Sequence, residues 1–565
     1  MALQATYPSR KYNVTQAFQR SLDSRYNNSY ISRHNQVDCL AVFSLGTCFM
    51  NNNQQMTGRS SAQQRQRRLR RLRILGASSI ILLISLLAVN IAWSIQPITL
   101  KFVVPSGEIA FWTSSASGGE LSLIEEFEAK NPRIQIEVVP GSSKTNGLQA
   151  TYEAAFEAGV PYDLVYMDSI WTEPFAKNSQ GKSRGWLKNL SRDFPDARKM
   201  FLPEALTSEG NQDELYRIPF VVDLGVVYRR SDLVENAPRT FKELINLSRE
   251  KQIIPTLQNP SGDRNELNDG YLWGYIWQGY RYEGLVVNFF EVLKGLGGNW
   301  YFNPETNRVH LDEVPAREAV KLLLNMVYDP EQRVSSPLVS TYSERESIDE
   351  FNKGHAIFLR GWSNAWQDIS GGPMSGKVEI QPVVSGDGNS SHPCIGGWGF
   401  GVAQRSRHPS EAVEAIKFFT STEAQRKFVL KTGYLPSREA VWNDPRLPSN
   451  YREHFSKMKE ILKSSASRPA TPLYDEAAGV LKQNLGEALA GRYLTEALSE
   501  TLDASVKGLV EQQSSKAFAD QLVKRVRNAI ENTSEKSMQN AASQTERCTQ
   551  LVETKSSLSE DCAPV

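Results

Sequence analysis

The sequence predicts an α/β fold, and three observations support this prediction. The chain has 565 residues, 40% of them hydrophobic, which is enough for two cores at the usual ~100 to 200 residues per domain. A strand, a helix and a second strand are expected in succession between residues 107 and 140, the order of a parallel crossover unit. YDLVYMD (162–168) is apolar without alternation, as buried parallel strands are.

The first three elements follow from local patterns. GEIAFWTSS (107–115) is expected to be a strand that ends in a loop of small residues. GGELSLIEEFEAKNP (118–132) has a helical period, and RIQIEVVP (133–140) alternates apolar and polar residues like a strand. The expected apolar face of the helix comprises Leu121, Ile124 and Phe127.

The remaining elements continue the α/β pattern. YRIPFVVDLGVVYRR (216–230) is a second extended apolar run. Residues 410–433 have helical spacing, with a capping box predicted from Thr422 to Gln425 and a helix end at Gly433. A final helical region is expected over 474–512. No repeat of solenoid length is present in the sequence.

Composition argues against several classes of partner. The first 107 residues hold only two acids, so the rest of the chain is mildly acidic, which does not favour nucleic-acid binding. The five cysteines form no C-x-x-C pair, and only Cys394 lies in the expected globular body. The six histidines show no paired spacing. We therefore expect no metal site, no cofactor and no nucleic-acid partner.

An apolar segment near the N-terminus predicts contact with the membrane. Residues 74–95 carry no charge and match the ~20 residues that span a bilayer. Seven arginines in 59–73 precede them, which marks the cytoplasmic side and predicts that the chain after about residue 96 faces outside.

The sequence leaves open whether this segment is an uncleaved transmembrane anchor or a signal peptide. Residues 92–94 fit a cleavage site, but the apolar run exceeds the ~7 to 15 residues of a signal core, which favours the anchor. Residues 1–73 are expected to be a disordered basic region, with Met1 or Met56 as the start. Residues 514–565 are expected to form a polar, partly helical tail.

Tryptophans and isolated acids indicate the chemistry of a binding site. GGWGFG (396–401) resembles a phosphate loop, but the sequence contains no G-x-x-x-x-G-K-[ST], which argues against nucleotide binding. Its glycines instead indicate a place where the backbone approaches a ligand closely. Trp362 and Trp398 each lie among small residues, and indole rings stack on the C–H faces of sugars. Asp168 and Asp223 interrupt apolar runs and need a structural or a ligand partner. Core packing remains the alternative for each tryptophan.

Taken together, several motifs resemble a known family. They are YEGLV (282–286), YDLVYMD, YRIPFVVDLGVVYRR, RGW (360–362), GGW (396–398) and RPATPLY (468–474). In this order, over roughly residues 107–513, the chain resembles the family 1 extracellular solute-binding proteins of ABC importers, closest to the branch that binds trehalose and maltose.

The resemblance implies a two-lobed periplasmic-binding-protein fold of the maltose-binding-protein-like type II, with a hinge and an interlobe cleft. The first lobe would comprise 107–222 plus 398–445, and the second 223–397 plus 446–513. The chain would cross between lobes near Asp223, Gly397 and residue 445. Such proteins carry no catalytic group; they close around a sugar and present it to a membrane permease.

Residue by residue, the resemblance also implies a set of ligand contacts. Asn364 replaces a common aromatic and Val221 a common tyrosine, which reduces the stacking surface and leaves the sugar open. The ring-rich stretch 271–282 would line and brace the cleft, with Glu283 either at the ligand or holding a loop. The expected ligand-binding residues are Asp168, Asp223, Trp362, Gly397, Trp398, Arg468, Tyr282 and Glu283.

These observations lead to one functional hypothesis and two alternatives. The hypothesis is a non-enzymatic binding component of an ABC carbohydrate importer, which captures a disaccharide or glucoside outside the cell membrane. The alternatives are a secreted glycoside hydrolase, which needs two carboxyl groups facing one bond at ~5 to 9.5 Å, and a binder of a non-sugar solute such as a polyamine.

Overall fold

The computed structural model describes residues 97–491 apart from 115–120, 161, 179–181, 207–213, 255–270, 304–307 and 390. The chain divides into two compact units, Met1–Ile95 and Gln96–Val565, and the fold below belongs to the second. The predictions for 1–73, 74–95 and 514–565 lie outside the described residues. Within the described part of the chain, no helix has the length and apolarity needed to cross a bilayer.

Strands and helices follow one another through the described part of the chain, joined by loops. The strands are β1 (Ile98–Pro105), β2 (Ile134–Gly141), β3 (Leu164–Asp168), β4 (Ile218–Arg230), β5 (Trp273–Ile276), β6 (Trp300–Asn303), β7 (Arg308–Leu311), β8 (Ala356–Trp362), β9 (Val378–Gln381), β10 (Cys394–Val402), β11 (Leu435–Pro436) and β12 (Ala466–Ser467). The α-helices are α4 (Ile109–Thr113), α5 (Leu123–Lys130), α6 (Thr145–Glu157), α7 (Thr172–Ala176), α8 (Ala197–Met200), α9 (Phe241–Lys251), α10 (Glu283–Gly295), α11 (Glu313–Tyr328), α12 (Glu344–Asn352), α13 (Trp366–Ser370), α14 (Pro409–Phe419), α15 (Thr422–Thr432), α16 (Glu439–Trp442), α17 (Ser449–Leu462) and α18 (Tyr474–Leu489). Short 3₁₀ turns are η1 (Ser169–Trp171), η2 (Pro203–Leu206), η3 (Pro337–Thr341) and η4 (Ser363–Ala365).

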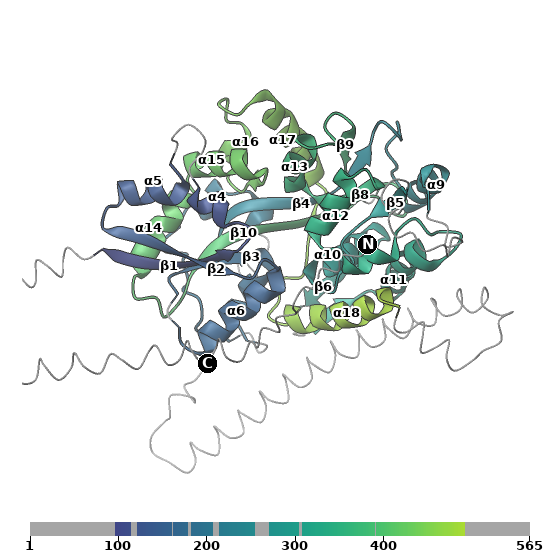
Figure 1. Cartoon of the computed structure of the whole chain (residues 1–565). Coiled ribbons are helices and arrows are strands. Elements are labelled where there is room, and N and C mark those ends of the chain that lie inside the picture. Colours follow the sequence, from purple (N-terminus) through teal and green to yellow (C-terminus); the bar gives the residue numbers. More distant parts are fainter. Residues whose placement is uncertain are drawn as a thin grey trace, which may run out of the picture. The chain divides into compact units, whose positions relative to one another are not determined.

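The main sheet has the strand order β2-β1-β3-β10-β4-β8-β5. β1 pairs in parallel with both β2 and β3, as the predicted crossover units require, and β10 is inserted antiparallel between β3 and β4. β4 belongs to both halves of the sheet: Ile218–Leu224 pairs with β10, whereas Gly225–Arg229 pairs with β8. Figure 1 shows β4 and β10 running between the elements around β1–β3 and those around β5 and β8, here called the first and second lobes. The predicted α/β, two-lobed fold is confirmed.

The prediction of a first strand at 107–115 is wrong. Residues Ile109–Thr113 form α4, and the first strand is β1, which ends before Gly107. A short apolar run such as IAFW fits a strand or a buried helix equally well. Trp112 is fully buried against the rings of Phe102 and Phe428, so packing decides for the helix.

Two details of predicted helices also need correction. Leu121 precedes α5 and is 48% exposed, because the helix begins after the capping residue Ser122. At α15 the cap is Ser421, whose hydroxyl accepts a hydrogen bond from the backbone N–H of Ala424. The Gln425 side chain instead donates to Ser437 Oγ at 2.8 Å, so a tertiary contact removes it from the predicted capping box. The helix end at Gly433, with φ +74°, is confirmed.

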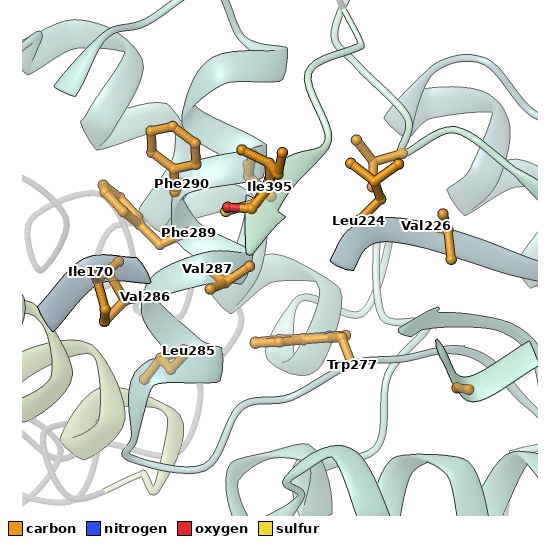
Figure 2. Packing of buried hydrophobic residues seen from close by; sticks show 14 of the residues in the cluster. Ile170, Leu224, Val226, Trp277, Leu285, Val286, Val287, Phe289, Phe290 and Ile395 are labelled. Atoms are coloured by element: carbon orange, nitrogen blue, oxygen red, sulfur yellow. The ribbon is translucent and has the colours of Figure 1, made fainter. Parts of the chain in front are cut away.

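A single apolar cluster connects α10 with the strands that run between the lobes. α10 is buried on nearly every side, and its residues 285–287 and 289–290 belong to the same cluster as Leu224 of β4 and Ile395 of β10. Figure 2 shows these side chains together with Ile170 of η1 and Trp277. The N-terminus of α10 is thereby held at a defined place beside both crossing strands.

Candidate functional site

A cavity of about 350 Å³ lies between elements of the two lobes, and all eight sequence-predicted ligand residues line it. The first lobe contributes the ends of β1, β2 and β3 with α15, and the second contributes α10, α12 and β8. Its volume falls within the range of pockets that hold small molecules, roughly 300–1,000 Å³. The predicted residues on its wall are Asp168, Asp223, Tyr282, Glu283, Trp362, Gly397, Trp398 and Arg468.

Strand register brings the distant sequence motifs together. Trp398 of β10 lies opposite Asp168 of β3, and two residues earlier Gly396 lies opposite Asp223 of β4. On the other side of β4, Gly225 pairs with Trp362 of β8. Since neighbouring strands lie only ~4.8 Å apart, residues separated by more than 200 positions become adjacent.

Gly397 is required at its position in β10. Its φ is +148°, a conformation that L side chains rarely adopt, and an added Cβ would lie 2.4 Å from the carbonyl oxygen of Val221. The strand register shifts immediately afterwards, between Trp398 and Gly399. The glycines around Trp398 therefore permit close packing of β10 on β4 while the main chain at Gly397 lines the cavity.

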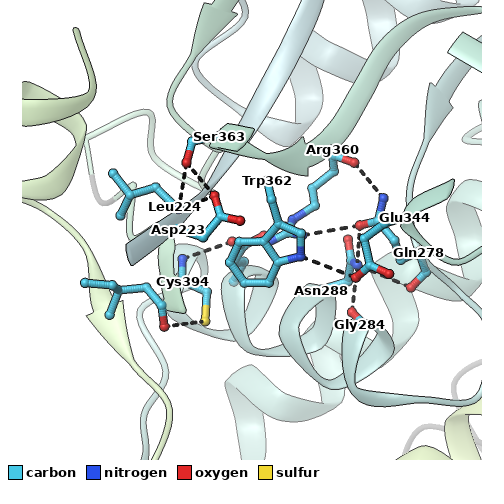
Figure 3. Close-up of polar contacts among 12 residues, drawn as sticks. Asp223, Leu224, Gln278, Gly284, Asn288, Glu344, Arg360, Trp362, Ser363 and Cys394 are labelled. Atoms are coloured by element: carbon cyan, nitrogen blue, oxygen red, sulfur yellow. Dashed lines mark hydrogen bonds and ion pairs between the residues drawn. The ribbon is translucent and has the colours of Figure 1, made fainter. Parts of the chain in front are cut away.

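The two cavity tryptophans are each supported from within the protein. Trp398 stacks on Tyr166, with ring centroids 5.0 Å apart, and meets the edge of Trp171. Trp362 lies beneath the guanidinium of Arg360, 4.4 Å from its ring centroid. Its Nε1 donates to Glu344 Oε1 at 3.3 Å, as Figure 3 shows. Both rings are only half-buried and both line the cavity, so each offers a fixed apolar surface to it.

Asp223 of β4 is held by hydrogen bonds from η4, which follows β8 in the second lobe. Its Oδ1 accepts hydrogen bonds from Ser363 Oγ and from the backbone N–H of Leu224 (Figure 3). The backbone N–H of Asn364 donates to the same oxygen. Burial nevertheless raises the pKa of this carboxyl to about 7, because desolvation outweighs these bonds. Asp223 therefore changes its charge near neutral pH.

Asp168, Glu283 and Arg468 form a buried network. Arg468 Nη1 donates to Glu283 Oε1 at 2.7 Å, and Nη2 lies 3.6 Å from Asp168 Oδ1. The hydroxyl of Tyr474 also donates to Glu283. Burial raises the pKa of Asp168, and the nearby Arg468 opposes that shift. The three residues predicted to contact a ligand thus also contact one another, and Arg468 links the end of β3 to the start of α10.

The ring-rich stretch 271–282 is mostly core. Trp273, Tyr275 and Trp277 are buried, and Trp277 donates its Nε1 hydrogen to Ser335 Oγ. Tyr282, 5% exposed, lines the cavity. Its hydroxyl lies near the Glu344 carboxylate without a hydrogen bond of normal geometry among the described residues.

Sequence reasoning missed several residues that line the cavity. Glu108 follows β1, and its Oε1 accepts a hydrogen bond from the hydroxyl of Tyr434 at 3.3 Å. Burial raises the pKa of Glu108 to about 7. The signal was present, since Glu108 is the first acid after a long stretch with only two, but assigning 107–115 to a strand hid it. Other polar side chains on the wall that the sequence did not indicate include Gln278, Glu344, Gln367, Asp368, Lys431 and Tyr434.

In the described part of the chain, no group of three or more histidine, cysteine, aspartate or glutamate side chains is arranged to hold a metal ion. The cavity wall consists of indole and phenol rings, carboxylates, two cationic side chains and glycine main chain. Rings and hydrogen-bonding groups that converge from two lobes on an enclosed space define a two-lobed ligand-binding protein.

Comparison with known proteins identifies the family. The family model of the bacterial extracellular solute-binding proteins matches residues 115–426, and the chain belongs to this family. A curated relative, the probable ABC transporter-binding protein of Deinococcus radiodurans, is 24% identical over 352 residues, which are 61% of this chain and 78% of the relative. The family predicted from the sequence motifs is confirmed.

Solved structures agree with this assignment. T. maritima MalE3 with bound maltose is 25% identical, with a TM-score of 0.61 over 77% of this chain and 99% of that one. The GacH receptor of Streptomyces glaucescens, solved unliganded and with acarbose, is 18% identical, with a TM-score of 0.59 over 78% and 99% of the two chains. The latter likeness concerns the fold.

Proposed function

We propose that this protein is the substrate-binding component of an ABC-type carbohydrate importer. It captures a disaccharide or glucoside, trehalose-like or maltose-like in size, in the interlobe cavity and delivers it to a membrane permease. β4 and β10, together with the chain near residue 445, act as the hinge between the two lobes. The protein performs no chemical reaction on the sugar.

The observation that carries this proposal is the pairing of half-buried indole rings with carboxylates on one cavity wall. Trp362 and Trp398 come from different strands and are fixed by Arg360 and Tyr166, so their apolar surfaces are in place before a ligand arrives. Asp168 and Asp223 lie beside them in the strand register. Rings that stack on C–H faces and acids that accept hydrogen bonds from hydroxyls together suit a saccharide.

Removing an indole ring tests this assignment. Trp398→Ala should weaken sugar binding by more than about ten-fold through lost stacking. Trp366→Ala provides a matched control, because Trp366 stacks on His454 and does not line the cavity. The full chain, purified in detergent, is screened by thermal shift across a sugar panel, since a bound ligand raises Tm. Calorimetry then measures the affinities, and equal affinity of Trp398→Ala and wild type would contradict the assignment.

The same preparation separates the alternatives. The protein is incubated with labelled trehalose, maltose and sucrose. Release of labelled products would support a glycoside hydrolase. Binding of spermidine without binding of any sugar would support a non-sugar solute.

For the membrane, we propose that residues 74–95 tether the protein to the outer face of the cell membrane or act as a signal peptide. Fractionation of cells, followed by mass spectrometry of the mature N-terminus, tests this proposal. Recovery of an intact chain in the cytoplasm would overturn it.

A further inference from the structure

Charges are distributed unevenly along the cavity wall. Six carboxylates and two cationic side chains line it. Both cations are already engaged: Arg468 contacts Glu283 and Asp168, and Lys431 donates to the main-chain carbonyls of residues 110, 111 and 114. The six acids are Glu108, Asp168, Asp223, Glu283, Glu344 and Asp368.

Three of these acids, Glu108, Asp223 and Glu344, line the cavity together with Tyr434, and we call this part of the wall the acidic end. Tyr434 donates to Glu108 Oε1. The pKa of Tyr434 is raised by its burial, then by the Glu108 and Asp223 carboxylates and further by Glu344, so all three act on the same hydroxyl. They come from the loop after β1, from β4 and from α12.

The described residues supply neutral donors but no ion pair to the acidic end. Glu344 accepts from the indole N–H of Trp362, and Asp223 accepts from a hydroxyl and two backbone N–H groups. Glu108 Oε2 has no hydrogen bond of normal geometry among the described residues, although the neutral Tyr166 hydroxyl also faces this carboxyl and lowers its pKa. Arg360 lies near Asp223, but its guanidinium is bidentate with Glu291 at 2.8 Å for both bonds.

Such a site favours a cation over a neutral hydroxyl. Asp223 is buried, whereas Glu108 and Glu344 are half-buried. A carboxylate withdrawn from water without a cation is costly in its ionised form, and hydroxyl donors offset that cost only in part. A protonated amine supplies both the opposite charge and up to three donated hydrogen bonds, which are stronger when both partners are charged.

We propose that the solute is an amine-bearing saccharide whose ammonium group binds at the acidic end while its sugar rings lie against Trp362 and Trp398. This inference rests on the proposed function and specifies the class of sugar. It also accounts for the difference between Asp168 and Glu283, which lie beside Arg468, and the acidic end, which has no ion pair among the described residues.

Matched ligand pairs test the inference. Calorimetry on the full chain compares glucosamine with glucose, deacetylated chitobiose with cellobiose, and trehalosamine with trehalose, at low and high salt. In each pair with measurable binding, we expect the amine to bind at least about ten-fold more tightly than the neutral sugar. This preference should fall as the salt concentration rises. N-acetylation of the same disaccharide removes the charge and should abolish the preference.

Isosteric variants locate the amine. Glu108→Gln and Glu344→Gln keep acceptors for Tyr434 and Trp362. The double variant should lose the amine preference about ten-fold, measured as the ratio of the two affinities within each ligand pair. Glu318→Gln, an exposed acid on α11 outside the cavity, is the control and should behave as wild type. A double variant that keeps the full preference would overturn the placement.

The outcomes distinguish the inference from the proposed function. Neutral sugars that bind as tightly as their amines would refute the inference and leave the carbohydrate importer standing. If no sugar binds, with or without an amine, both the inference and the proposed function are refuted. Binding of spermidine in place of all sugars would assign the acidic end to a polyamine and refute the saccharide class.

Discussion

The two ends of the cavity hold comparable carboxylates in different environments. At one end, Asp168 and Glu283 share the guanidinium of Arg468, and Tyr474 adds a further donor to Glu283. At the acidic end, Glu108, Asp223 and Glu344 receive hydrogen bonds from neutral groups alone among the described residues. At the first end, the Lys482 ammonium also lies 3.6 Å from Glu283 Oε2, so two cations face the two acids and the network joins the lobes. The acidic end has no ion pair among the described residues.

The difference shows that lining a cavity is not the same as being free to bind. The sequence predicted Glu283 and Arg468 as ligand contacts, yet each already has a close protein partner. Glu108 was not predicted, yet it lines the cavity and only the neutral hydroxyls of Tyr434 and Tyr166 face its carboxyl among the described residues. Partner availability, which depends on the tertiary structure, separates the two groups of acids.

The largest effect is expected from breaking the neutralised end. Arg468→Ala leaves Asp168 buried without its cation and leaves Glu283 with only the Lys482 ammonium, 3.6 Å away. This loss should lower the free energy of unfolding by about 3–5 kcal/mol. Urea denaturation measures this change. Arg345→Ala, which removes an 87% exposed arginine on α12, is the control and should leave the unfolding midpoint nearly unchanged. A similar small change for both variants would show that the network does not stabilise the fold.

A smaller loss is expected where β10 passes between the two ends. Gly397→Ala adds a Cβ against the Val221 carbonyl at an unfavourable φ, which should cost about 1–3 kcal/mol. Gly479→Ala in α18 meets nothing within 4 Å and should be neutral or stabilising. Thermal unfolding of both variants makes the comparison, and a tolerated alanine at Gly397 would contradict the close approach of β10 to β4.

At the acidic end, removing a charged side chain should stabilise the fold at high pH, whereas the two preceding variants destabilise it. Glu108 has a folded-state pKa of about 7 against an ordinary 4.5, so the folded protein binds more protons than the unfolded chain between these values. Its contribution to stability is therefore present below about pH 4.5 and is lost as the pH rises to about 7. Tyr434 and Tyr166 are the titratable groups that face it.

Glu108→Gln removes this dependence. At pH 8 the variant should be more stable than wild type by on the order of 1 kcal/mol, because no charge is buried. At pH 4.5 the two should be alike, and denaturation curves at both pH values measure the difference. A variant that is less stable than wild type at pH 8 would mean that the Glu108 carboxylate is compensated after all.

Much of the fold could be predicted from local patterns. The strands β2, β3 and β4 and the helix end at Gly433 all follow from periodicity and turn residues. β1 was not predicted, because the first strand was expected at 107–115. The errors concern short segments. IAFW became a helix because Trp112 packs among rings from β4, β10 and α15, which are distant in the chain. Gln425 left its predicted cap to bind Ser437.

The sequence by itself determined the kinds of side chain that face the cavity, because indoles and acids placed in apolar or glycine-rich runs can be recognised without coordinates. It also determined the family through the order of its motifs. The tertiary structure alone decided which of them are neighbours and which are already neutralised. Both depend on the antiparallel insertion of β10 between β3 and β4 and on where Arg468 lies, which are contacts between residues far apart in the chain.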